Sequence, residues 1–79
     1  FKASVYPNPA KELIYLKLDF DTGEKLSFQL LDMNGSLLES KKLDENITSI
    51  FLSHLIPSTY LLVVKRKNKG EKTFKIIKK

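Results

Sequence analysis

Few side chains in this 79-residue chain could do covalent chemistry. There is no cysteine, which excludes thiolate nucleophiles, thiolate metal sites and disulfide bonds together. The single histidine, His54, has no serine, cysteine or carboxylate at a recognisable catalytic spacing, and the chain has no nucleophile elbow or glycine-rich oxyanion loop. Catalytic partners meet in space rather than in sequence, so spacing alone does not exclude a triad. We expect a non-enzymatic protein without a cofactor, in which His54 is an ordinary surface residue.

Carboxylates alternate along residues 19–24, where Asp19 and Asp21 precede Gly23 and Glu24. Calcium favours such clusters of carboxylate oxygens. The distal glutamate of the full calcium loop is missing, however. An ordinary Asp/Gly turn is therefore the favoured interpretation and no metal site is predicted. Weak calcium binding by Asp19 and Asp21 stays an open alternative.

Basic residues are concentrated near the C-terminus of the chain, whose formal net charge is +5. Residues 65–79 hold eight bases and one acid, a net charge of +7, whereas residues 1–64 have a net charge of −2. Such asymmetry indicates an anionic partner: nucleic acid, lipid head groups or an acidic receptor. Binding of single-stranded nucleic acid also needs exposed aromatic rings, and we expect the nearby Tyr60 and Phe74 to face the core. Lysines that protect edge strands are the favoured interpretation, with no nucleic-acid partner.

The elements that must position these side chains are short strands, because apolar residues alternate with a period of two. Asn34-Gly35 favours a tight hairpin turn, and a second hairpin turn is predicted at 68–71. No stretch has helical periodicity with both caps. The predicted strands are 4–6, 12–18, 25–32, 36–42, 46–52, 60–67 and 72–77.

Seven short strands with a turn signal about every 8–12 residues are typical of a sandwich or barrel. We predict a single all-β domain over residues 1–79, a seven-stranded antiparallel immunoglobulin-like β-sandwich. The apolar segment 60–67 is expected at the centre of a sheet. The side chains expected to face the core include Ile14, Leu16, Leu18, Leu26, Phe28, Leu30, Ile50 and Leu52, with Leu55 tucked beneath the sandwich.

No apolar run approaches the ~20 residues that span a bilayer, so no transmembrane segment is expected. The sequence shows no signal peptide and begins at Phe1 rather than at a methionine. We therefore expect a fragment of a longer secreted protein, whose main domain precedes this one.

Four motifs occur in a fixed order along the chain. They are Val5-Tyr6-Pro7-Asn8-Pro9-Ala10, then Phe28-Gln29-Leu30-Leu31-Asp32-Met33-Asn34-Gly35, then Ile50-Phe51-Leu52-Ser53-His54-Leu55 leading to Tyr60-Leu61-Leu62-Val63, and finally Lys75-Ile76-Ile77-Lys78-Lys79. From Val5 to Lys79 the chain resembles the type A C-terminal sorting domain of type IX secretion cargo, the Por secretion system family of Bacteroidota. One departure is Ser58, since the family usually has glycine two residues before the tyrosine; a slightly different turn is expected there.

The resemblance implies a non-catalytic signal that directs a folded cargo protein through the outer-membrane type IX translocon. The implied partners are translocon components, a cell-surface sortase and an N-terminal cargo domain in the same chain. The implied route crosses the periplasm and the outer membrane, and ends with secretion or at the cell surface. The sortase would remove the domain and attach the cargo to anionic lipopolysaccharide.

The motif residues are spread over nearly the whole chain, so only a folded sheet could present them together to a receptor. Pro7 and Pro9 lack N–H donors and are expected to end the first strand, and Asn8 to bond its own backbone in an Asx-turn. Tyr60 is expected to place its ring in the core and its hydroxyl near the rim. The predicted recognition residues are Pro7, Asn8, Pro9, Gly35, Tyr60, Lys75, Ile76, Ile77, Lys78 and Lys79.

An alternative function is a carbohydrate- or surface-binding accessory module of immunoglobulin or fibronectin-III type. Fold alone does not separate the two, because β-sandwiches host many functions. Sugar binding usually needs exposed aromatic platforms, and the chain has no tryptophan.

Overall fold

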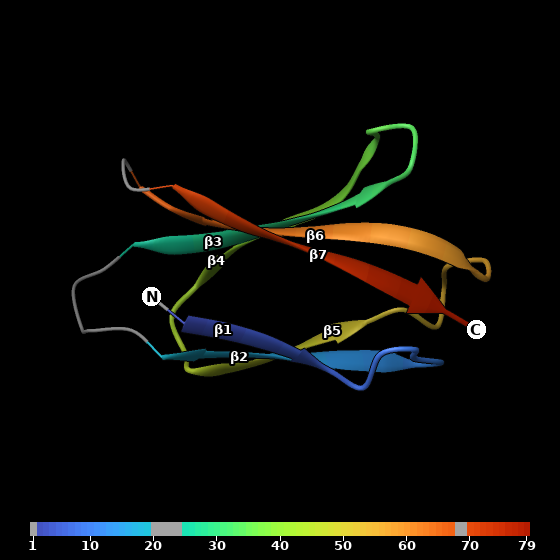
Figure 1. Cartoon of the computed structure of the whole chain (residues 1–79), viewed down its shortest axis with the longest axis horizontal. Coiled ribbons are helices and arrows are strands. Elements are labelled where there is room, and N and C mark those ends of the chain that lie inside the picture. The colour runs from blue at the N-terminus through green and yellow to red at the C-terminus, as the bar shows by residue number, and fades with distance from the viewer. Residues whose placement is uncertain (1, 20–24, 68–69) are drawn as a thin grey trace.

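Two antiparallel sheets lie face to face in the computed structural model, which describes residues 2–19, 25–67 and 70–79 (Figure 1). The described residues contain no helix, and therefore no helix long and apolar enough to cross a membrane. The strands are β1 Lys2–Tyr6, β2 Leu13–Asp19, β3 Leu26–Asp32, β4 Leu37–Leu43, β5 Ile47–Phe51, β6 Ser58–Arg66 and β7 Glu71–Lys78. The predicted all-β sandwich of seven strands is confirmed.

The strands are ordered β1-β2-β5 in one sheet and β4-β3-β6-β7 in the other, and neighbouring strands are antiparallel. In the immunoglobulin arrangement the first, second and fifth strands share one sheet, and the third, sixth and seventh share the other. This chain follows that pattern for six strands. The remaining strand, β4, differs from the constant-type domain, whose fourth strand joins the first sheet, because here it pairs with β3 at a sheet edge. Consequently β1, β5, β4 and β7 are the edge strands.

The core lies between the sheets and is built by the predicted alternation. On β2 the side chains of Ile14, Leu16 and Leu18 are buried, whereas Tyr15 and Lys17 between them are exposed. The facing β3 buries every second residue in the same way. The core comprises Ala10, Ile14, Leu16, Leu18, Leu26, Phe28, Leu30, Leu43, Ile50, Leu52, Tyr60, Leu62, Val64 and Ile76, with Ala3, Val5, Leu55 and Phe74 packed against it. Every core-facing residue predicted from the sequence is among them.

Strand β6 occupies the interior position predicted for the most apolar segment, between β3 and β7. It begins at Ser58 and ends at Arg66, so the predicted connection 53–59 is too long and the predicted strand end at 67 is too late. Ser58 pairs with Lys78 in extended backbone, which any residue adopts. The different turn expected at Ser58 is therefore the start of a strand.

The β3–β4 hairpin reverses where the sequence predicts it. Gly35 has φ +86°, and a Cβ there would meet nothing within 4 Å, so the backbone conformation itself requires glycine. The carboxylate of Asp32 accepts hydrogen bonds from the N–H groups of Asn34 and Ser36, both at 2.9 Å. The glycine was predicted, whereas this stabilising role of Asp32 was not.

Two other predicted turns fall wholly or partly outside the described residues. Residues 20–24, which contain Asp21, lie outside them, as do residues 68 and 69. The second hairpin is described on either side of residues 68–69. Its two strands are joined there by a hydrogen bond from the Arg66 N–H to the Gly70 carbonyl, at 3.0 Å.

Candidate functional site

The segment Pro7-Asn8-Pro9-Ala10 lies against the outer edge of β7, near the C-terminus (Figure 1). The Ala10 N–H donates to the Ile77 carbonyl, and the Lys79 N–H donates to the Ala10 carbonyl, each at 2.8 Å. These bonds form a parallel bridge between Ala10 and Lys78. Ala10 is buried, so its short side chain fits against the core. We call residues 7–10 the edge clamp.

The side chain of Asn8 extends this pairing by one step. Its Nδ2 donates to the Lys75 carbonyl at 2.8 Å, and its Oδ1 accepts from the Ile77 N–H at 2.9 Å. In a parallel ladder, a backbone residue bonds one carbonyl and the N–H two positions further on. The Asn8 amide supplies the same donor and acceptor. The predicted Asx-turn is therefore wrong, because both ends of this amide bond to β7 rather than to its own backbone.

The two prolines explain why a side chain takes this role. Pro7 and Pro9 have no N–H group, so the backbone on either side of Asn8 cannot donate to a ladder. The peptide bonds before both prolines are cis. Strand β1 ends at Tyr6, immediately before them, which confirms the predicted strand end.

The end of β7 alternates between core and surface. Ile76 is fully buried, whereas Ile77 is 43% exposed and Lys75 and Lys79 are exposed. Lys78 is half-buried, and its ammonium donates to the Lys79 carbonyl at 3.1 Å. The exposed residues brought together here form what we call the clamp surface: Pro7, Asn8, Pro9, Lys75, Ile77 and Lys79.

The structure places three predicted recognition residues elsewhere. Tyr60 is only 4% exposed, with its ring in the core, and its hydroxyl donates to the Ile56 carbonyl at 2.6 Å. This is the tyrosine corner found near the start of the sixth strand of immunoglobulin-like domains. Ile76 is equally hidden, and Gly35 lies at the tip of the β3–β4 hairpin. Tyr60 and Ile76 therefore offer a receptor almost no side-chain surface, whereas Gly35 is exposed but lies away from the clamp surface. A role of these three residues in recognition stays a prediction.

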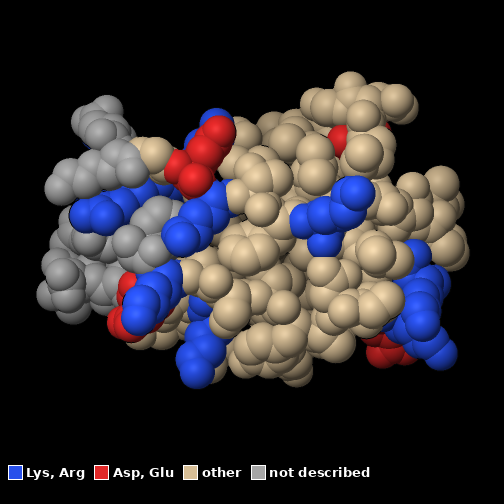
Figure 2. Space-filling model, viewed as in Figure 1, with Lys and Arg blue, Asp and Glu red and all other residues tan. Residues whose placement is uncertain are grey.

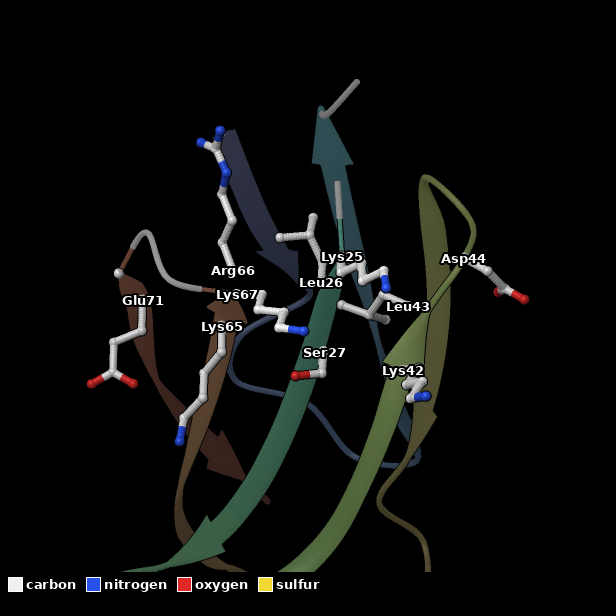
Figure 3. Close-up of a pocket in the computed structure, with 11 residues that line it drawn as sticks. Lys25, Leu26, Ser27, Lys42, Leu43, Asp44, Lys65, Arg66, Lys67 and Glu71 are labelled. Atoms are coloured by element: carbon white, nitrogen blue, oxygen red, sulfur yellow. The ribbon is translucent and has the colours of Figure 1, made fainter. Parts of the chain in front are cut away.

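A second region, a basic hollow of about 930 Å³, lies where β3 begins and β6 ends. Ser27 pairs directly with Lys42 on one side and Lys65 on the other. Figure 3 shows the Lys67 side chain extending toward Ser27, whereas those of Lys65 and Arg66 point away from it. The hollow is lined by Lys25, Leu26, Ser27, Lys42, Leu43, Asp44, Lys65, Arg66, Lys67, Gly70 and Glu71. The basic character is therefore shared by Lys25, just before β3, and Lys42 on β4, which the charge asymmetry of the sequence did not indicate.

Basic side chains also occur away from this hollow, in the middle and at the right end of the face shown in Figure 2. The aromatic residues of β6 and β7 do not accompany them at the surface. Tyr60 is buried and Phe74 packs against the core, as predicted. The base-stacking surface that single-stranded nucleic acid needs is thus not provided by these two rings.

Exposed aromatic residues lie instead on the outer face of the β1-β2-β5 sheet. Tyr6 and Tyr15 pair across β1 and β2 with ring centroids 5.7 Å apart, and Phe51 on β5 is 59% exposed. Sequence reasoning did not single out this face. The signal was present, because Tyr15 alternates with the core residues Ile14 and Leu16 and must point outwards.

The remaining candidates from the sequence offer no assembled chemistry. His54 is exposed in the connection between β5 and β6. Over residues 2–19, 25–67 and 70–79, no group of three His, Cys, Asp or Glu side chains could hold a metal ion. Asp19 ends β2, but its suggested calcium partner Asp21 lies outside the described residues. Calcium binding there stays an untested alternative.

Comparison with known proteins identifies the family of this chain. A family model described as a secretion system C-terminal sorting domain matches residues 4–79, from β1 through the edge clamp to the last residue. The chain belongs to this sorting-domain family. The resemblance indicated by the four motifs is confirmed, and the domain is a type IX secretion sorting signal. No curated protein matches the chain.

Membership gives the sorting domain its general role. Sorting domains of this kind are non-catalytic signals, and they imply interaction with the secretion machinery. The role implies export to the cell surface or secretion through the outer membrane. The match includes both halves of the clamp surface, although Asn8 and Lys75 are far apart in the sequence.

Proposed function

We propose that the sorting domain docks on the outer-membrane type IX translocon through the clamp surface, as a folded unit. One observation supports this above the others: Asn8 bonds to β7 residues that are 67 and 69 positions away in the chain. A linear peptide taken from only the N-terminal or only the C-terminal end of the chain would lack half of this surface. Recognition of the folded domain therefore accounts for motif residues at both ends of the sequence.

The clamp surface combines charge with apolar contact. Lys75 and Lys79 provide two exposed ammonium groups, and the half-exposed Ile77 lies between them. Complementary charge on the receptor would speed encounter more than it strengthens the final complex. Ile77 and the two proline rings would supply apolar contact. Of the other predicted recognition residues, Tyr60, Ile76 and Lys78 would hold these groups in place, and Gly35 would act through the β3–β4 hairpin.

In this proposal the domain is the address label of a larger protein. A cargo domain on its N-terminal side crosses the inner membrane by means of a separate signal peptide. After docking and export, a cell-surface sortase removes the domain and attaches the cargo to anionic lipopolysaccharide. Membership of the sorting-domain family supports this sequence of steps.

The test uses a reporter protein with this chain at its C-terminus, expressed in a bacterium with a type IX system. Deleting residues 75–79 should abolish secretion while the fusion accumulates in the periplasm. That deletion also removes the buried Ile76, so a surface variant is needed beside it. Reversing Lys75 and Lys79 to Glu should lower secretion about tenfold, the effect of ~1.4 kcal/mol of lost docking energy.

A matched pair of exposed lysines away from the clamp surface, Lys17 on β2 and Lys41 on β4, provides the control. Reversing those two to Glu makes the same change in net charge and should leave secretion as it is. Equal secretion by both double variants, or normal secretion after the deletion, would contradict docking through the clamp surface.

The accessory-module alternative has one structural observation in its favour, the exposed Tyr6, Tyr15 and Phe51 on the outer face of the β1-β2-β5 sheet. Aromatic faces of this kind can stack on sugar rings. The unmodified reporter fusion separates the two functions, because a sugar-binding module without a sorting role would not direct that fusion to be secreted.

A further inference from the structure

We propose that the open part of the β7 edge, from Glu71 to Lys75, pairs with an extended segment of a receptor protein, which adds a strand to the four-stranded sheet. This inference rests on the docking role proposed above and specifies how the contact forms. The four-stranded sheet would become five-stranded in the complex, with β7 no longer at its edge.

The first step is to identify which backbone groups point away from the sheet. The Lys75 carbonyl and the Ile77 N–H do so, because both bond to Asn8 on the outer side of β7. Alternate residues of a strand direct their N–H and C=O groups to the same side. The Lys75 N–H, both backbone groups of Thr73 and the Glu71 carbonyl therefore point to this same outer edge.

The second step concerns what covers those groups. The edge clamp bonds only to the part of β7 from the Lys75 carbonyl to the Lys79 N–H. Within the described ranges, no group bonds to the outward backbone groups of Thr73 or to the Lys75 N–H. The side chains of Thr73 and Lys75 are exposed. Half of this edge is thus paired, and the adjoining half presents unpaired donors and acceptors.

The third step is that this edge already accepts a strand-like partner. Ala10 provides one parallel ladder position, and the Asn8 amide provides the next one along. A receptor segment that began where the Asn8 amide stops would continue the same ladder. In strand addition, main-chain hydrogen bonds supply affinity, and contacts of alternate side chains supply specificity.

The side chains along the open edge indicate the chemistry of the partner. Lys72 and Lys75 stand on opposite faces of β7, and residues 71–75 contain two lysines and one acidic residue, Glu71. Opposite charges on paired strands stabilise the pairing, and like charges oppose it. Edge lysines discourage pairing with a second copy. The segment that fits is therefore extended and carries acidic side chains.

Thr73→Pro tests the proposal, because it removes the central outward N–H. The Thr73 N–H points away from β6, so no bond within the sheet is lost, and proline is tolerated at such edge positions. Thr73→Ala is the matched control, since it shortens the same side chain and keeps the N–H. In the reporter fusion, Thr73→Pro should reduce secretion about tenfold, corresponding to ~1.4 kcal/mol. Thr73→Ala should secrete like the parent fusion.

A measurement on the unmodified domain guards against misfolding of the proline variant. Amide hydrogen exchange followed by NMR should be fast at Thr73 and Lys75 and slow at Ile77, whose N–H bonds to Asn8. Slow exchange at Thr73 and Lys75 in the free domain would overturn the proposal, as would equal secretion of the proline and alanine variants.

Two outcomes distinguish failure of strand addition from failure of the docking role on which it rests. If the unmodified fusion is not secreted, the docking role itself is contradicted. If it is secreted and Thr73→Pro is secreted equally well, only strand addition fails. A concentration-dependent dimer in sedimentation experiments that Thr73→Pro abolishes would assign the edge to a second copy, and so reject a receptor strand.

Discussion

Asn8 replaces a backbone amide with a side-chain amide at a place where proline has removed the backbone donors. Its two hydrogen bonds join the end of β1 to the end of β7, on opposite sheets of the sandwich. The Tyr60 hydroxyl makes a comparable contact, because it donates to the carbonyl of Ile56, four residues earlier in the chain. Both residues thus fix a chain segment whose position no regular strand pairing sets.

Replacing Asn8 by alanine should lower the free energy of unfolding by about 1–3 kcal/mol. The reason is the loss of two hydrogen bonds, each with a net value of about 0.5–1.5 kcal/mol. The urea midpoint of the isolated domain measures the effect. Asn46→Ala is the control, because Asn46 is exposed and makes no side-chain hydrogen bond in the described structure. Indistinguishable midpoints for the two variants would show that the side-chain hydrogen bonds of Asn8 contribute nothing to stability.

At the scale of elements, strands and their buried faces could be predicted because period-two alternation is a local property. Strand β4 is the exception: Glu39 and Lys41 lie opposite the core residues Leu30 and Phe28. Charged residues on this face protect an edge strand, and they interrupt the apolar alternation that would identify the face from the sequence, where Leu43 is the buried residue of β4. The partners of Asn8 could not be predicted either, because no local pattern specifies a bond across most of the chain.

Hairpin geometry depends on Asp32 as well as on Gly35. Asp32→Ala should lower the melting temperature by about 4–8 °C, corresponding to ~1 kcal/mol in a domain of this size. Its carboxylate would no longer accept from the Asn34 and Ser36 N–H groups. Asp32→Asn keeps an oxygen in the same position and should restore most of the loss. A loss with asparagine as large as that with alanine would contradict the hydrogen-bond explanation.

Considered as a whole, the domain has little stability to spare. It has no disulfide bond, and 79 residues at about 0.05–0.15 kcal/mol each give roughly 4–12 kcal/mol of stability. Packing between the two sheets supplies most of it. The clamp surface exists only while that packing holds, since its two halves belong to opposite ends of the chain.

This dependence yields a test with two phenylalanines. Phe28→Ala removes a fully buried ring far from any surface contact and should cost about 3–5 kcal/mol. Phe51→Ala deletes the same atoms from a ring that is 59% exposed, so much less packing is lost. The Phe28 variant should therefore lose sheet signal in circular dichroism at 37 °C and secrete poorly, whereas the Phe51 variant should do neither. A receptor that read a linear sequence would secrete both fusions equally well, because neither substitution changes a clamp residue. Normal secretion of an unfolded Phe28 variant would thus contradict recognition of the folded domain, provided that its fusion reaches the periplasm intact.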